Sequence, residues 1–351
     1  MREAPAPGRA PAVSDLAAGS PRPLAERFDT ALLDLDGVVY VGADAVPGAA
    51  DALRRARAAG MRLAFVTNNA ARTPETVAAH LCDLGVEASV DEVVTSAQAA
   101  ATMVADRVAP GSRVLVVGGD GLVEALRERG LRPVSSADDD PAAVVQGFAP
   151  HVDWAMLTEG VLAVRRGVPW VAANMDLTVP TARGLAPGNG ALVTAVAAAT
   201  GATPEVAGKP EPALHRESTR RSGAREPLVV GDRLDTDIEG AVRAGVPSLL
   251  VLTGVTSPAD LLAAAPERRP TYVAEGLASG LLEPHPPVTR DGDAWVCTGW
   301  RAVSDARGWR VEGEGSRVDG LRALCVGVWS GAAPDARLEE ALQVLERVRP
   351  G

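Results

Sequence analysis

Short apolar runs alternate with amphipathic segments along most of the chain, from residue 28 to about residue 281. The runs at 31–33, 63–66 and 113–117 have the length of strands, and helical periodicity follows each of them. Residues 47–59 are typical of a helix, because a proline lies near their start and Gly60 follows their end. This alternation predicts an α/β fold with a parallel sheet.

The two ends of the chain have a different pattern. Residues 1–27 contain five prolines and little periodicity, so we expect a flexible leader there. A proline-rich segment at 282–290 is expected to be a linker. After it come glycine- and tryptophan-rich stretches, with strand-like runs at 295–297 and 324–328 and a helix from about 336 to 348. We therefore expect a small C-terminal α+β module over residues 291–351.

The composition narrows the classes of protein that fit. Hydrophobic residues make up 46% and charged residues 23% of the chain, as in ordinary globular proteins. There are only 3 Phe, 6 Trp and 2 Tyr, and four of the Trp lie in the last 57 residues. The formal net charge is −10. Few aromatic residues and an acidic balance argue against a nucleic-acid partner, because such proteins use stacking surfaces or clustered basic residues.

The cysteines and the longest apolar runs bear on the compartment. Cys82, Cys297 and Cys325 are an odd number without metal-ligand spacing, which favours a reducing environment. The N-terminal residues lack the apolar segment of a secretory signal, and no run approaches the length of a membrane span. We therefore expect a cytoplasmic protein with no membrane partner.

Polar residues that can carry chemistry follow several of the predicted strands. Asp34 and Asp36 come directly after the first apolar run. Two buried carboxylates so close together are costly unless a cation such as Mg²⁺ joins them. An ordinary Asp-Gly turn is the alternative interpretation of this segment.

Three further segments have the same placement. Thr67 and Asn68 offer neutral donors to an anionic oxygen, or they form a simple loop or cap. Lys209, between Gly and Pro, supplies a positive charge for a phosphate, or is a solvated surface lysine. Asp232 and Asp237 lie in a second acidic loop, where one carboxylate could complete a metal site. Because ligands bind at the carboxyl ends of parallel strands, these segments can converge.

In this order, the motifs resemble those of the haloacid-dehalogenase-like (HAD) superfamily of phosphatases, and most closely its 4-nitrophenylphosphatase-like branch. The resemblance covers residues 28–281 and rests on Asp34-x-Asp36-Gly37-x-x-Tyr40, Thr67-Asn68-Asn69, Gly208-Lys209-Pro210 and Gly231-Asp232-x4-Asp237-Ile238. It implies a Rossmann-like core over 28–106 and 205–281, with an α/β cap domain inserted over 107–204. It also implies Mg²⁺ as cofactor and a small phosphorylated metabolite as substrate.

The resemblance implies a role for each matching residue. Asp34 is the expected nucleophile, and Asp36 the acid and then the base in a two-step hydrolysis through an aspartyl-phosphate. Thr67 and Asn68 match phosphate-binding positions. Lys209 matches the residue that steadies the nucleophile and the phosphate charge. The expected metal ligands are Asp34, Asp36 through its carbonyl, and Asp232, with Asp237 behind them.

The substrate is less defined by these motifs. Asn174 and Asp176 lie in a stretch that resembles the cap loop facing the leaving group, where Met175 replaces a more usual proline. They could bind hydroxyls of a polyol phosphate or be ordinary turn residues. Composition and the appended module resemble actinobacterial glycerol-3-phosphate phosphatases, so glycerol 3-phosphate is the favoured substrate. Phosphoglycolate, pyridoxal phosphate or nucleotides are alternatives, as is a non-catalytic binding protein.

The C-terminal module leaves three roles open. It resembles part of an acetyltransferase fold, but it contains no glycine-rich pyrophosphate loop that would support acetyl transfer. A packing lid, a dimer surface and a small-molecule regulatory site all remain, and a homo-oligomer is one expectation.

Overall fold

The computed structural model describes residues 15–181, 183–331 and 337–348. Its central element is a parallel six-stranded sheet, the core sheet, with the order β15-β14-β13-β1-β4-β5. Its strands come from both sides of residues 107–204: β1 Thr30–Leu33, β4 Arg62–Thr67, β5 Val93–Thr95, β13 Pro227–Gly231, β14 Ser248–Val251 and β15 Tyr272–Ala274. The α/β fold class is confirmed.

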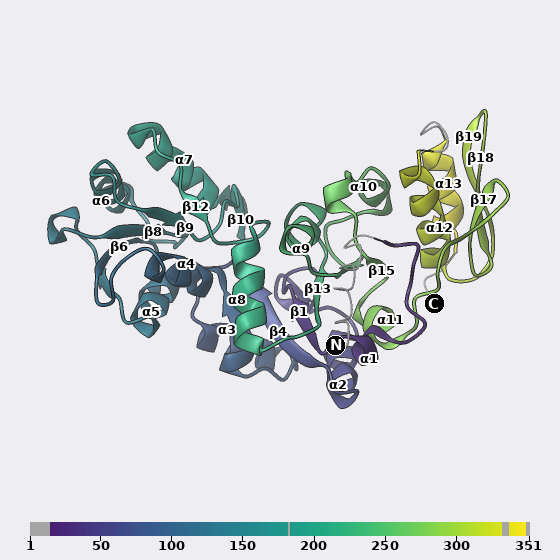
Figure 1. The fold of residues 1–351 in the computed structure, drawn as a ribbon, viewed down its shortest axis with the longest axis horizontal. Helices are drawn as coiled ribbons and strands as arrows, with labels where there is room; N and C mark the ends of the chain where they lie inside the picture. The colour runs from purple at the N-terminus through teal and green to yellow at the C-terminus, as the bar shows by residue number, and fades with distance from the viewer. Residues whose placement is uncertain (1–14, 182, 332–336, 349–351) are drawn as a thin grey trace, which may run out of the picture.

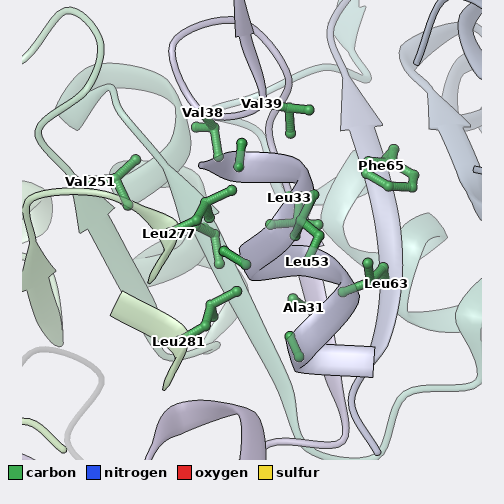
Figure 2. Close-up of a cluster of buried hydrophobic side chains, with 14 of the residues drawn as sticks. Ala31, Leu33, Val38, Val39, Leu53, Leu63, Phe65, Val251, Leu277 and Leu281 are labelled. Carbon is green, nitrogen blue, oxygen red and sulfur yellow. The ribbon is translucent and has the colours of Figure 1, made fainter. Parts of the chain in front are cut away.

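Both faces of the core sheet are covered because its strands are apolar on both sides. Ala31 and Leu33 of β1 belong to one buried cluster, whereas Leu32 between them belongs to another. Figure 2 shows the first cluster, in which Leu33, Leu53 and Leu277 lie together. The helices of the core are α1 Leu24–Arg27, α2 Ala49–Ala58, α3 Pro74–Asp83, α4 Ser96–Ala105, α8 Pro212–Ser222, α9 Glu239–Ala244, α10 Pro258–Leu262 and α11 Leu277–Leu282.

A second parallel sheet, the cap sheet, lies beside the core sheet, to the left in Figure 1. Its order is β12-β9-β8-β6-β7. The expected boundary at residue 204 falls slightly early, because Glu205 and Val206 pair with β9 of this sheet rather than with the core. Its elements are β6 Arg113–Val117, α5 Asp120–Glu128, β7 Arg132–Val134, β8 Ala143–Gln146, α6 Trp154–Val164, β9 Trp170–Ala172, β10 Thr178–Thr181, β11 Gly184–Pro187, α7 Asn189–Thr200 and β12 Glu205–Val206.

The C-terminal residues form an antiparallel four-stranded sheet covered by two helices, to the right in Figure 1. The strand predicted at 324–328 is wrong, since these residues lie inside α12. That helix is buried on nearly all sides, so its apolar run has no helical period to reveal it. The elements are β16 Thr289–Asp291, β17 Ala294–Cys297, β18 Trp300–Asp305, β19 Gly308–Gly313, α12 Arg317–Trp329 and α13 Leu338–Glu346.

This module shares a hydrophobic cluster with the core sheet. Trp295, Trp300 and Trp309 pack in one buried group with Leu250 of β14 and Val273 of β15. The expected linker is correspondingly short, because β16 already begins at residue 289. The module and the core sheet therefore share one buried apolar cluster, and Arg322 of α12 also donates a hydrogen bond to the Val273 carbonyl of β15.

The expectation of a flexible leader over 1–27 is wrong for its second half. Leu16 and Leu24 are buried, and Ser20 exchanges two main-chain hydrogen bonds of 2.7 and 2.8 Å with His285. These apolar anchors hold the segment despite its prolines. Residues 1–14 lie outside the described part of the chain.

None of the helices in the described part of the chain combines the length and the apolar character that crossing a membrane requires.

Candidate active site

The polar residues predicted from the sequence lie at the carboxyl edge of the core sheet. Asp34 follows β1, Thr67 ends β4 and Asp232 follows β13, and these three strands are neighbours in the sheet. Lys209 follows β12 and comes back to the same edge, where it contacts Asp34. Parallel neighbours end at the same edge, which explains why residues so far apart in sequence meet here.

Lys209 lies between two carboxylates. Its Nζ atom donates a hydrogen bond to Oδ1 of Asp34 and a 2.6 Å hydrogen bond to Oδ1 of Asp237. The side chains of Lys209 and Asp237 are only 4% and 1% exposed. Burial alone would lower the pKa of Lys209, but Asp237 and Asp34 outweigh it and raise that pKa. The ammonium is thus held charged inside the protein.

The acidic residues bear the cost of this burial. Desolvation raises the pKa of Asp34 to about 7, although Lys209 opposes the shift. Desolvation, together with the nearby charge of Asp237, raises the pKa of Asp232 to about 6. A cation at this place would relieve both carboxylates.

The donor set fits Mg²⁺. Carboxylate oxygens of Asp34, Asp232 and Asp237 lie within 4.8 Å of one another. Oδ1 of Asp232 is buried without a hydrogen-bond partner, whereas its Oδ2 accepts a 2.7 Å bond from the N–H of Val255. Hard oxygen ligands with a free lone pair are what this cation requires.

Two glycines, Gly37 and Gly254, lie so close to the Asp232 carboxylate that a side chain at either position would collide with it. A Cβ atom on Gly37, which has a φ of +81°, would lie 2.4 Å from Oδ2 of Asp232, and one on Gly254 would lie 2.0 Å from it. Asp237 differs, because its two oxygens already accept from Nζ of Lys209 and from the N–H of Arg233. Asp34 and Asp232 are therefore the carboxylates free to hold the metal, and Asp237 lies behind them.

The loop after β1 is shaped by contacts on its main chain. The side chain of Asp36 is exposed, and Gly37 is held by the N–H it donates to Tyr40 and by the 2.6 Å bond its carbonyl accepts from Oγ1 of Thr253. Burial and the charge of Asp34 raise the pKa of Tyr40 to about 12. Tyr40, the last residue of the first motif, and Thr253, which the sequence did not single out, thus lie beside the site.

Thr67 and Asn68 behave differently from each other. The Thr67 hydroxyl accepts a 3.1 Å bond from the N–H of Asn69, which leaves its proton to donate. The amide of Asn68 is engaged: its Oδ1 accepts from the N–H of Lys209 at 2.8 Å, and its Nδ2 donates to the Lys209 carbonyl at 3.2 Å. The expectation that this amide binds phosphate is therefore not supported, and Thr67 is the better donor.

The cap reaches the site through the loop after β9. Asn174 is 5% exposed, donates to the Asn68 carbonyl at 2.7 Å and accepts from the N–H of Asp176 at 3.1 Å, so both of its amide atoms have a partner within the protein. The Asp176 carboxylate lies 3.4 Å from Nδ2 of Asn68. Burial raises the pKa of Asp176 against the opposing charges of Arg233 and Lys209. Of the two cap residues, Asp176 is the one that faces the site.

Two residues that the sequence did not single out also shape this junction. The hydroxyl of Ser96, at the start of α4, donates to the Asn68 carbonyl at 2.6 Å. Asn189, at the start of α7, donates to the Asn174 carbonyl at 2.7 Å. The signal available in the sequence was the Gly-Asn-Gly run at 188–190, just before a helix.

Three family models match parts of the chain. A haloacid dehalogenase-like hydrolase model matches residues 31–132, and a HAD-hydrolase-like model matches residues 206–279. A GCN5-related N-acetyltransferase-like domain model matches residues 297–347. The two hydrolase segments are those that carry the acidic residues and Lys209.

Characterised relatives and solved structures agree with these models. The D-glycerol 3-phosphate phosphatase of Mycobacterium tuberculosis is 47% identical over 316 residues, 89% of each chain, and the acid sugar phosphatase of Staphylococcus aureus is 37% identical over 238 residues, 67% of this chain and 91% of the relative. A crystal structure of the M. tuberculosis glycerol phosphate phosphatase with magnesium superposes with a TM-score of 0.83 at 44% identity, covering 93% of this chain and all (100%) of that one. The 4-nitrophenylphosphatase of Thermotoga maritima gives 0.67 at 29% identity, covering 73% and 97%.

The chain therefore belongs to the haloacid dehalogenase-like hydrolases, as the motifs predicted. Within that family it is a phosphatase, and Mg²⁺ is its cofactor.

Proposed function

We propose that this phosphatase hydrolyses glycerol 3-phosphate. The observation that carries the proposal is the 47% identity to a D-glycerol 3-phosphate phosphatase over 316 residues, 89% of both chains. The acid sugar phosphatase, by contrast, is matched by only 67% of this chain. The relative that shares more of the chain is the better guide to its substrate.

The chemistry of the site supports a two-step transfer. The Asp34 carboxylate attacks phosphorus, and the bond to the glyceryl oxygen breaks while Asp36 gives that oxygen a proton. In the second step, Asp36 takes a proton from water, which attacks the aspartyl-phosphate and releases inorganic phosphate. Lys209 and the Thr67 hydroxyl stabilise the negative charge on the phosphoryl oxygens. Asp34, Asp232 and the carbonyl of Asp36 would hold Mg²⁺, which would supply further positive charge there.

The position and charge of Asp176 favour a substrate whose leaving group is a neutral polyol over one whose leaving group is anionic. Its carboxylate lies 3.4 Å from Nδ2 of Asn68, at the junction of cap and core, where it can accept a hydrogen bond from a hydroxyl. The carboxylate of phosphoglycolate would be repelled there. Flat aromatic esters have few rings to stack on, because Phe148, Trp154 and Trp170 are the only Phe, Trp or Tyr residues in the cap sequence and Trp170 is buried.

The test is phosphate release from a panel of esters with and without Mg²⁺. We expect glycerol 3-phosphate to have the highest kcat/KM, and release to stop when the metal is chelated. A higher value for phosphoglycolate, pyridoxal phosphate or a nucleotide would refute the substrate. No release from any ester would favour a binding protein.

We also propose how the chain is divided and where it acts. The core spans residues 28–106 and 207–281, the cap spans residues 107–206, and the C-terminal module follows. The protein acts in the cytoplasm on free metabolites, without a nucleic-acid or membrane partner. The free thiols of Cys82, Cys297 and Cys325 support a reducing compartment. Light scattering of the purified protein would show whether it forms a homo-oligomer.

A further inference from the structure

A series of side-chain amides runs from the cap sheet to the main chain of Lys209. It begins at Asn189, the first residue of α7, which is 1% exposed. Nδ2 of Asn189 donates to the carbonyl of Asn174 at 2.7 Å and lies 3.4 Å from the carbonyl of Gln146, at the end of β8. The start of a cap helix is thereby joined to the cap loop over 173–176.

The second and third links cross from the cap to the core. Nδ2 of Asn174 donates to the carbonyl of Asn68 at 2.7 Å. The side-chain amide of Asn68 then binds both main-chain polar groups of Lys209: it accepts a hydrogen bond from the N–H at 2.8 Å and donates one to the carbonyl at 3.2 Å. Three asparagines, here called the asparagine series (Asn68, Asn174 and Asn189), thus connect α7 to the residue that contacts Asp34.

Close packing fixes the position of this series. A Cβ atom on Gly190 would lie 2.2 Å from the carbonyl oxygen of Met175, and one on Gly208 would lie 2.6 Å from both the Ala173 carbonyl and Oδ1 of Asn68. Main-chain segments that approach this closely cannot shift independently. A movement of the cap loop therefore reaches the Lys209 peptide.

The residue type also has a physical reason. An amide donates and accepts at the same time without carrying a charge, so the series adds none beside the buried ammonium of Lys209. An aspartate at any of its positions would lose the donor and add a buried negative charge.

We propose that Asn174 and Asn189 are positioning residues that set the main chain of Lys209 through Asn68, and so place its ammonium between Asp34 and Asp237 when the cap loop is seated. Neither cap residue touches the substrate. The inference rests on the phosphatase activity but not on glycerol 3-phosphate as the substrate, since it concerns a group that every phosphate ester would meet.

A double-mutant cycle between Asn189 and Asn68 tests the proposal. The assay measures kcat and KM with 4-nitrophenyl phosphate and with whichever ester the panel shows to be turned over fastest. We expect Asn189→Ala and Asn68→Ala each to lower kcat by about tenfold or more, and the double variant to be no slower than the slower single variant, because residues acting in series couple. KM should change less than kcat. Losses that multiply in the double variant would overturn the proposal.

Two further variants separate positioning from folding. Thr194→Ala removes a 2.8 Å hydrogen bond to the Gly190 carbonyl within α7, outside the series, and should leave kcat within twofold of the wild type. Asn189→Ser keeps a small polar residue at the helix start and serves if the alanine variant does not fold. Unchanged kcat in folded Asn189→Ser, or a loss confined to KM, would overturn the proposal. Because activity on any ester suffices, a wrong substrate leaves this test intact.

Discussion

The Nζ atom of Lys209 lies 2.6 Å from Oδ1 of Asp237, and both side chains are almost completely buried. A buried ammonium beside a single carboxylate would be neutral as a pair. Here Asp34, which also contacts Lys209, and the nearby Asp232 add two negative charges, which a divalent cation would neutralise. Asp237 therefore fixes the lysine from behind, while Asp34 remains on the side that faces the substrate.

Replacing the ammonium should show what it contributes. We expect Lys209→Met to lower kcat by roughly 10²- to 10³-fold, the usual loss when a group that stabilises transition-state charge is removed. The variant also leaves Asp34 and Asp237 without their shared partner, so the thermal midpoint should fall. Steady-state kinetics and circular dichroism measure the two effects. Arg225→Met, at an exposed arginine, is the control; equal activity of both variants would contradict the role of Lys209.

Asp232 should control metal affinity more than turnover at saturating metal. Asp232→Asn removes the charge of a carboxylate whose Oδ1 has no protein partner, so the Mg²⁺ concentration for half-maximal activity should rise by about tenfold or more. A titration of activity with Mg²⁺ measures this. As a control, Asp139→Asn, at an exposed position of the cap, should not shift the Mg²⁺ titration curve. An unchanged curve for Asp232→Asn would remove this residue from the metal site.

Asp176 should act on the choice between esters. With Asp176→Asn, we expect the ratio of kcat/KM for phosphoglycolate to that for glycerol 3-phosphate to rise by about tenfold, since one repulsive charge near the leaving group is gone. Burial raises the pKa of this carboxyl, and Arg233 offsets part of its charge, so the effect is moderate. Competition between the two esters in one reaction gives the ratio directly. If Asp176→Asn gave the same ratio as Asp139→Asn, the role of Asp176 in choosing between the two esters would be refuted.

Much of the site follows from strand ends that the sequence reveals. Asp34, Lys209, Asp232 and Asp237 were predicted to converge, and they do. Asp34 and Asp232 follow neighbouring parallel strands of the core sheet, which end at one edge, whereas Lys209 reaches that edge from the end of β12 in the cap sheet. The engagement of Asn68 with Lys209 was not predictable in this way. The two residues lie 141 positions apart, and whether an amide faces a phosphate or a peptide depends on side-chain packing.

The errors in the fold have a common physical cause. Burial on all sides removes the periodicity that separates helix from strand, which is why the run at 324–328 in α12 was misread. The proline-rich composition also predicted a flexible segment at residues 15–27, whereas the two buried leucines Leu16 and Leu24 anchor it. In both places the partner surface belongs to a distant part of the chain.

Acid should destabilise the protein through His285. Burial, and then the charge of Arg322, lower its pKa to about 4 from the usual 6.5. The unfolded chain therefore binds this proton first as pH falls, and stability is lost from pH 6.5 down to about pH 4. Between pH 6.5 and 5 the loss is about 2 kcal/mol for this group.

Urea unfolding at several pH values checks the contribution of His285. His285→Gln should reduce the acid loss by about that 2 kcal/mol, whereas His151→Gln, at an exposed position, should leave the pH profile unchanged. His215, whose pKa burial also lowers to about 4, adds a loss of the same sign in all of these proteins. Parallel profiles for the wild type and His285→Gln would contradict the assignment.

The C-terminal module should stabilise the catalytic core through Arg322. This buried residue of α12 donates 2.6 Å hydrogen bonds to Asp319 and to the Val273 carbonyl of β15 in the core sheet. Arg322→Ala leaves Asp319 buried without its cation, at a cost of about 3–5 kcal/mol, or a fall of roughly 4–7 °C in Tm for a chain of 351 residues. Arg301→Ala breaks an exposed 2.8 Å pair with Asp291 in the same module and should cost at most about 1 kcal/mol. Calorimetry measures the two Tm values. The kcat at 25 °C should be unchanged in both variants, which distinguishes a packing role from a catalytic one. Equal Tm values for the two variants would show that the module does not support the core through this residue.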